Sequence, residues 1–160
     1  PAFLNEAQAI EDAIRTAEYA FRIGCDAVSF EPLGVDRDTI TEMLYQSGFF
    51  KPAWLWTPIT VALQTYDLGE IRIGGLQFSP LPDHLPRNCT ECTPRVLNAI
   101  DTYNLTYDTS ALTDIECQVC QSSWREELAL LDANILEDQI LEQIQDFLSG
   151  LKSQPLAAQF

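Results

Sequence analysis

The fold class is decided by residues 27–34, Ala27-Val28-Ser29-Phe30-Glu31-Pro32-Leu33-Gly34. The first four residues are a short apolar run and the last four favour a turn, which is the pattern of a buried strand and its loop. Upstream, apolar residues recur at helical spacing over residues 5–24, after a capping box formed by Asn5 and Gln8. A helix followed by a strand predicts half of a βα repeat, and hence an α/β layer.

The same pattern repeats downstream. Thr39 and Glu42 form a second capping box, which predicts a helix that ends before Gly48. Thr57-Pro58 predicts the start of a third helix, and residues 70–75 have the composition of a second strand. Because alternation of apolar and polar residues is weak in both strands, we expect helices on both faces of a parallel sheet.

Two strands cannot close a sheet, so the N-terminal half is predicted to be the last portion of a larger barrel or open sheet. The missing strands would precede Pro1 or come from another chain. Residues 79–86 contain three prolines and predict a connector. We therefore place a domain boundary there: residues 1–78 are predicted to end the α/β barrel, and residues 79–160 to form a four-cysteine metal module with C-terminal helices.

Helical signals dominate the second half. Thr93-Pro94 predicts the start of one helix, and a capping box at Ser123 and Glu126 predicts the start of a long C-terminal helical stretch. The apolar stripe of this stretch includes Ile135, and Asp132-Ala133-Asn134 predicts a kink in it.

Charge excludes one class of partner. The chain has 24 acidic and 9 basic residues, a net charge of −15, so it lacks the cations that unaided nucleic-acid binding requires. No apolar run is long enough to span a membrane, and the N-terminus has no signal-peptide pattern. We expect a cytoplasmic chain with no membrane partner and no direct nucleic-acid binding of its own.

Cysteine spacing is the sharpest chemical signal. Four of the five cysteines form two Cys-x-x-Cys hooks, Cys89/Cys92 and Cys117/Cys120, with 24 residues between them. Two hooks supply the four thiolates of a tetrahedral structural zinc site, in which the metal stabilises the fold and takes no part in catalysis. The residues therefore predict an α/β fold: the last portion of a larger barrel or open sheet, then a small four-cysteine zinc module and a long C-terminal helical segment.

Other interpretations of these residues stay open. An iron–sulfur cluster, or no metal at all, is compatible with the spacing. Disulfides are disfavoured without a secretion signal, and a redox role for one hook would not explain the second. The fifth cysteine, Cys25, is predicted to be a small buried residue. His84, the single histidine, is predicted to be exposed rather than a substitute ligand.

Strand ends indicate where a cofactor would bind. Ligands of α/β barrels lie at the C-terminal ends of the strands, so Glu31 and Gln77 are candidate cofactor-binding residues, although Glu31 would equally cap the next loop. Gly74-Gly75 would permit close approach by a ligand, and a strand bend explains the pair as well. Trp54-Leu55-Trp56 could stack a planar substrate, but an aromatic anchor in the core is the favoured interpretation.

Several blocks together resemble the C-terminal half of radical SAM proteins, specifically the archaeosine-biosynthesis radical SAM group and the related tRNA-modifying elongator-like enzymes. The matching blocks, within residues 5–127, are Ala27-Val28-Ser29-Phe30-Glu31-Pro32-Leu33-Gly34-Val35, Thr39-Ile40-Thr41-Glu42-Met43-Leu44, Phe50-Lys51-Pro52-Ala53-Trp54-Leu55-Trp56, and the paired cysteines with Trp124. The resemblance implies a partial (β/α)6 barrel that holds a [4Fe–4S] cluster and S-adenosylmethionine, used to make a carbon radical on a tRNA base or its precursor.

The chain departs from that family at the cluster. Those enzymes bind it through Cys-x-x-x-Cys-x-x-Cys, a spacing that these 160 residues lack, and three thiolates are required for reductive cleavage. The cluster and S-adenosylmethionine are therefore expected only if an upstream barrel half or a partner chain completes the site. The predicted function is the C-terminal half of a radical SAM enzyme, tRNA-modifying and not catalytic alone. The alternatives are a non-catalytic zinc-stabilised module that binds a partner protein, and a metal-free acidic scaffold.

Overall fold

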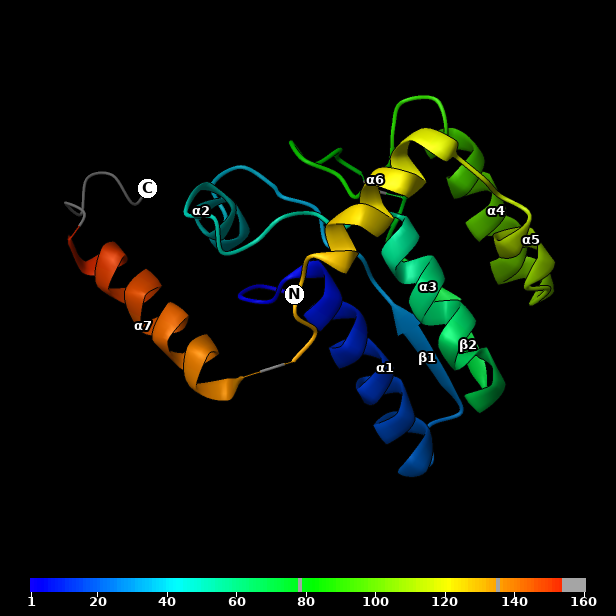
Figure 1. Ribbon diagram of the computed structural model, residues 1–160, viewed down its shortest axis with the longest axis horizontal. Helices are drawn as coiled ribbons and strands as arrows, with labels where there is room; N and C mark the ends of the chain where they lie inside the picture. The colour runs from blue at the N-terminus through cyan, green and yellow to red at the C-terminus, as the bar shows by residue number, and fades with distance from the viewer. Residues whose placement is uncertain (78, 135, 154–160) are drawn as a thin grey trace.

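The computed structural model describes residues 1–77, 79–134 and 136–153 (Figure 1). Phe78 at the predicted boundary, Ile135 in the predicted stripe and residues 154–160 lie outside this part of the chain. Its helices include none that is long and apolar enough to span a membrane. In chain order the elements are α1 (Glu6–Arg22), β1 (Ala27–Phe30), α2 (Ile40–Gln46), α3 (Trp56–Thr65), the 3-10 turn η1 (Tyr66–Leu68), β2 (Glu70–Ile73), α4 (Thr93–Thr106), α5 (Ser110–Thr113), α6 (Gln118–Ala129) and α7 (Glu137–Ser153).

The fold is mixed α/β, mostly helical, with one small parallel sheet. β1 and β2 are both present, and Phe30 pairs with Ile73 in the register of the sheet. α1 and α3 pack together and cover one face of the sheet (Figure 1). Ser29 and Arg72, which also pair, lie on the other face and are exposed. The prediction of helices on both faces is therefore wrong for the described residues, because one face of the sheet is open to solvent.

The two outer edges of the sheet differ. At the β2 edge, the backbone N–H of Ile73 donates to Oδ1 of Asn104 in α4 (3.0 Å), and Asn104 Nδ2 donates back to the Ile73 carbonyl (2.7 Å). The Tyr103 hydroxyl donates to the carbonyl of Ile71 (3.0 Å). β1 pairs with no strand besides β2 in the described chain. The side chains of α4 therefore end the sheet at β2 and leave β1 as its open edge.

Two predicted capping boxes mark real helix starts. Asn5 and Gln8 cap α1 reciprocally, as predicted. Thr39 accepts the backbone N–H of Glu42 (3.2 Å), whereas the Glu42 carboxylate accepts the backbone N–H of Asp38 (2.8 Å) instead of that of Thr39. The second box is thus half formed, and its helix, α2, begins at the predicted place.

Two other predicted N-caps are wrong, although the helices that they were predicted to start are present. α3 begins at Trp56 without a side-chain cap, and the Thr57 hydroxyl donates to the Glu6 carboxylate. α6 begins at Gln118, earlier than predicted, and the hydroxyl of Ser123 donates to the Val119 carbonyl within the helix (3.1 Å). A cap would need each hydroxyl oxygen to accept a backbone N–H of the first helical turn. The oxygen of Thr57 instead accepts from Trp124 Nε1 (3.3 Å), and Ser123 lies within α6.

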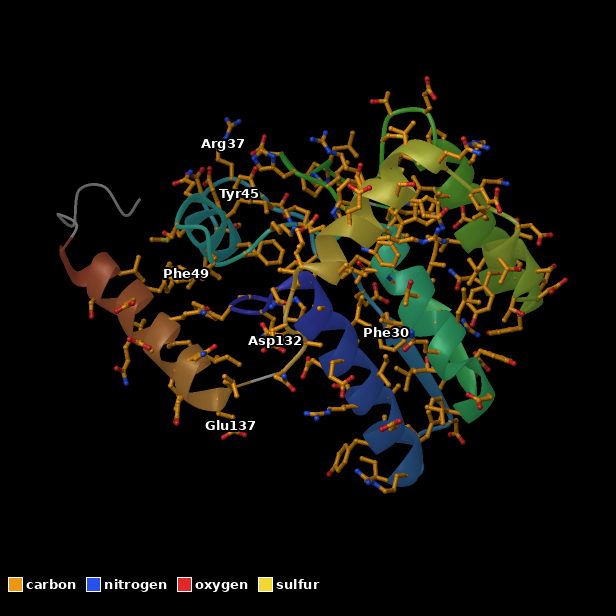
Figure 2. All side chains as sticks on the ribbon, viewed as in Figure 1. Phe30, Arg37, Tyr45, Phe49, Asp132 and Glu137 are labelled. Atoms are coloured by element: carbon orange, nitrogen blue, oxygen red, sulfur yellow. The ribbon has the colours of Figure 1, made fainter. Side chains whose placement is uncertain are left out.

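The C-terminal stretch is two helices with a break between them. The residues predicted to form a kink, 132–134, lie in this break. Asn5 Nδ2 donates to the Asp132 carbonyl (2.9 Å) and Gln8 Nε2 to the Asn134 carbonyl (2.7 Å). The break is therefore fastened to the start of α1, beside which Figure 2 labels Asp132.

A small apolar cluster holds α7. The ring centroid of Phe147 lies 6.1 Å from that of Phe3 and 5.9 Å from that of Phe49. Phe49 follows α2, and Figure 2 shows it between α2 and α7. The last helix thus packs on the N-terminal segment and on the chain that follows α2.

The main core includes residues from both sides of the predicted boundary. Ala17, Ile59 and Ile71 from the N-terminal half share it with Val96 and Trp124 from the C-terminal half. The division at residues 78 and 79 stays a prediction. The cysteine hooks, however, are built on the same core as α1 and α3.

Candidate metal centre

The structure brings the cysteines of the two hooks together. The Sγ atoms of Cys89, Cys92, Cys117 and Cys120 all lie within 4.8 Å of one another. Two contacts join one hook to the other: 3.7 Å separates the sulfurs of Cys89 and Cys117, and 3.2 Å those of Cys92 and Cys120. The four-cysteine cluster predicted from the spacing is present.

Helix starts position the hooks. Cys92 is the N-cap of α4 and Cys117 the N-cap of α6, with Cys120 in the first turn of α6. Cys89 is held by Thr93, whose backbone N–H and hydroxyl both donate to the Cys89 carbonyl, at 3.0 and 2.8 Å. Two helix N-termini thus converge on the sulfurs, where their dipoles favour thiolate over thiol.

The sulfur separations fit one tetrahedral ion. Four thiolates at about 2.3 Å from a common zinc ion lie about 3.8 Å from one another. In a four-iron cluster each cysteine binds a different iron, so its sulfurs lie farther apart than ligands of one ion. Cys92 and Cys120 are buried, and the other two are half-buried. The cluster can therefore hold a metal ion such as zinc with protein ligands alone.

Without a metal, the thiol pKa shifts in opposite directions at Cys117 and Cys92. Hydrogen bonding from the backbone N–H of Cys120 lowers the pKa of Cys117 to about 6. Burial raises the pKa of Cys92, because a charge there is poorly solvated. A bound cation would offset this penalty, since metal coordination requires the thiolate and releases its proton.

Trp54-Leu55-Trp56 contacts both hook segments. Trp54 Nε1 donates to Glu127 Oε2 in α6 (3.1 Å). The backbone N–H of Leu55 donates to Asn88 Oδ1, in the loop before the first hook (2.9 Å). Trp56 Nε1 donates to Cys120 Sγ (3.4 Å). Leu55 and Trp56 are buried and Trp54 is half-buried, so the interpretation as a core anchor holds for the last two residues of the block.

Glu6 is a buried carboxylate beside this block that sequence reasoning missed. Its Oε1 accepts the backbone N–H of Trp54 (3.2 Å) and the Thr57 hydroxyl, and Trp124 Nε1 donates to the same hydroxyl oxygen (3.3 Å). Burial raises the pKa of Glu6, against these hydrogen bonds and the attraction of Lys51. An acidic residue in a first helical turn usually interacts with the helix dipole in solvent, so the sequence carries no signal of its burial.

The two candidate cofactor-binding residues lie away from the hooks. Glu31 is exposed, and a Cβ on Gly74 would overlap its carboxylate. The close approach that this glycine permits is therefore made by the chain's own side chain. Gln77 is exposed, and no hydrogen bond joins it to Glu31 among the described residues. Neither lines the groove of about 1070 Å³ beside the hooks, whose walls include Trp54 and His84.

The remaining candidates have no place in the cluster. Cys25 is exposed, so the prediction of a buried residue is wrong: Gly24, with φ of 95°, turns the chain outward at the end of α1. His84 is exposed, as predicted, and lies outside the group of ligands. Its ring stacks on Tyr45 with 4.3 Å between the centroids, and its backbone pairs with Val35.

Comparison with known proteins gives two relatives. The chain is similar to archaeosine synthase subunit beta of Methanosarcina acetivorans, 29% identical over 133 residues, which covers 82% of this chain and 38% of the relative. It is also similar to an uncharacterized protein of Methanocaldococcus jannaschii, 24% identical over 140 residues, covering 85% of this chain and 38% of that protein. No family model and no solved structure matches it.

The first relative is named as an archaeosine synthase subunit, and the second is uncharacterized. The chain spans about 38% of the length of the curated relatives it matches.

Proposed function

We propose that this chain is the C-terminal portion of a tRNA-modifying radical SAM enzyme, to which it contributes the last barrel strands and a structural zinc site. The single observation that carries the proposal is the similarity to archaeosine synthase subunit beta over 82% of the chain. Because the chain spans 38% of that relative, the remaining strands and the catalytic cluster would come from a preceding segment or a partner chain.

The sheet supports a place at the end of a barrel. In a (β/α) barrel the helices lie outside, and the inner faces of the strands line the interior. Here α1 and α3 cover one face, whereas the opposite face presents Ser29 and Arg72. The β2 edge is satisfied by α4 and the β1 edge is open, so further strands would add beside β1.

The residues of this chain do not fit a radical SAM cluster on their own. The required Cys-x-x-x-Cys-x-x-Cys spacing is missing from the 160 residues, and the sulfurs of the two hooks are gathered for one ion. When bound in a completed barrel, the cluster and S-adenosylmethionine would supply a carbon radical on a tRNA base or its precursor. Glu31 and Gln77, which follow β1 and β2, would then contribute to holding that cofactor.

The hooks fit one tetrahedral ion such as zinc better than a four-iron cluster. Cys89, Cys92, Cys117 and Cys120 would bind it with no position left open, so the metal would hold α4 and α6 in place. Elemental analysis of the purified chain should give one zinc per chain and a colourless solution. A brown, iron-containing protein would contradict this assignment.

Reconstitution tests the enzymatic part. The purified chain is mixed with the polypeptide that carries the three-cysteine cluster motif, which is either the segment that precedes this chain or its partner chain. Association, followed by reductive cleavage of S-adenosylmethionine that requires both parts, is the expected result. A second mixture contains Glu31→Ala in place of the wild-type chain. This variant should associate normally and cleave less S-adenosylmethionine. Cleavage at an equal rate without this chain would refute the proposal.

The runner-up function is a non-catalytic zinc-stabilised module that binds a partner protein. The open β1 edge favours it, because an unpaired strand edge can accept a strand of another chain. Reconstitution separates the two functions: stable association without any S-adenosylmethionine cleavage supports the module, and cleavage that depends on this chain excludes it.

A further inference from the structure

One N–H···S contact connects the metal centre to the half of the chain that has no metal ligand. Trp56 Nε1 donates to Cys120 Sγ at 3.4 Å, and the two side chains are 3% and 4% exposed. Trp56 is the first residue of α3. A metal-bound thiolate keeps negative charge and lone pairs, and in a buried place it needs a protein donor because water does not reach it.

The half-buried sulfurs differ from Cys120 in the hydrogen-bond donors available to them. Cys89 and Cys117 are partly open to solvent, so water can donate to them. Cys117 also accepts the backbone N–H of Cys120. Cys92 Sγ also lies 3.2 Å from Cys120 Sγ, but a thiol that binds a metal gives up its proton. Among the described residues, the indole of Trp56 is then the side-chain donor that remains for Cys120.

Neighbouring contacts fix the position of Trp56. The backbone N–H of Leu55 donates to Asn88 Oδ1 (2.9 Å), and the hydroxyl of Thr57 donates to the Glu6 carboxylate. Residues on both sides of Trp56 are thus held by buried hydrogen bonds. A donor that is ordered before the metal binds loses little conformational freedom when it does.

We propose that Trp56 is a positioning residue of the metal centre, whose indole N–H stabilises the Cys120 thiolate and so raises the affinity of the four-cysteine site for a divalent metal. The inference rests on the proposed metal site. Outer-shell hydrogen bonds of this kind change metal affinity by about 10- to 100-fold. Metal affinity then depends on the correct packing of α3, in the half of the chain without ligands.

Cobalt is a suitable probe, because four thiolates give Co²⁺ an intense sulfur-to-metal charge-transfer band whose energy reports the electron density on sulfur. Trp56→Phe removes the donor and keeps most of the aromatic volume. Trp124→Phe is the matched control: it removes a buried indole N–H in the helix that carries Cys120, but that N–H donates to Thr57 and not to sulfur.

We expect Trp56→Phe to bind Co²⁺ and Zn²⁺ about 10- to 100-fold more weakly, with the charge-transfer band at lower energy. Trp124→Phe should keep the wild-type band. Unchanged affinity and band energy in Trp56→Phe, or equal shifts in both variants, would overturn the inference. A wild-type chain that binds no Co²⁺ would instead refute the metal site, and the inference with it.

A measurement on the wild-type chain covers the case in which Trp56→Phe fails to fold, as judged by far-ultraviolet circular dichroism. In the chain loaded with cadmium-113, the indole proton of Trp56 should show a scalar coupling to the metal through the N–H···S contact. The indole signals are assigned from spectra of Trp54→Phe and Trp124→Phe. Absence of the coupling in a folded, cadmium-loaded chain would overturn the inference.

Discussion

Replacement of one hook cysteine measures what the metal contributes to stability. Cys117→Ser removes one of four ligands, and because Cys117 is only half-buried, lost packing adds little. A structural zinc site contributes on the order of 10 kcal/mol of apparent binding free energy, so one ligand in four accounts for about 2.5 kcal/mol or more. In a domain of this length each 1 kcal/mol shifts the unfolding midpoint by about 2–4 °C, and we expect a decrease of about 5–10 °C.

Cys25→Ser is the matched control, because Cys25 is exposed and lies outside the cluster. It should change the free energy of unfolding by less than about 0.5 kcal/mol. Thermal unfolding is followed by circular dichroism on the zinc-loaded proteins, with metal content measured on the same samples. A chelator should lower the midpoints of all three proteins, and that of Cys117→Ser by a smaller amount, because this variant has already lost the contribution of one ligand. Equal midpoints for the two serine variants, with one zinc per wild-type chain, would refute the reasoning.

Three further changes test other parts of the fold. Because the pKa of Glu6 is raised from 4.5, its stabilising contribution is complete below about pH 4.5 and is lost as the pH rises through the folded-state pKa. Glu6→Gln should thus have a higher thermal unfolding midpoint than wild type near neutral pH, and the difference between the two midpoints should shrink toward about pH 4. A difference that stays the same at all pH values would contradict this. Ile100→Ala should cost about 2–5 kcal/mol in urea unfolding, because Ile100 is 1% exposed, whereas Leu105→Ala in the same helix, at 83% exposed, should cost under about 0.5 kcal/mol. Asn104→Leu leaves the backbone N–H and carbonyl of Ile73 without these partners, and it should lower the free energy of unfolding by about 1–3 kcal/mol. Asn98→Leu, at an exposed position of the same helix, is the control, and an equal decrease in its free energy of unfolding would argue against the edge contact.

Each cysteine hook could be predicted because its geometry is local, and two such hooks favour one ion that they share. Two residues between cysteines bring both sulfurs to the same side of a turn, and Thr93-Pro94 marks the helix start that follows the first hook. The strand at residues 27–30 and the cap at Asn5 also depend on neighbours in sequence. These are the features in which expectation and structure agree.

The features that the sequence does not reveal depend on contacts between distant residues. Thr57 resembles an N-cap, but Glu6 reaches its hydroxyl from α1. The amide of Asn104 resembles a polar helix residue, yet it closes a strand edge 31 positions away. Cys25 is a small apolar residue by composition, and burial was expected, but a glycine turn directs it outward. Tertiary context decided each of these, because local preference alone leaves several partners possible.

The cap of α4 is one of the four sulfur ligands, and two side chains of the same helix occupy the outer side of β2. If the metal were lost, α4 would be held less firmly and the outer edge of β2 would be exposed, as that of β1 already is. Two unprotected strands invite intermolecular β pairing, the first step of fibrillar self-association. Metal binding would then protect the β2 edge of the sheet from such pairing.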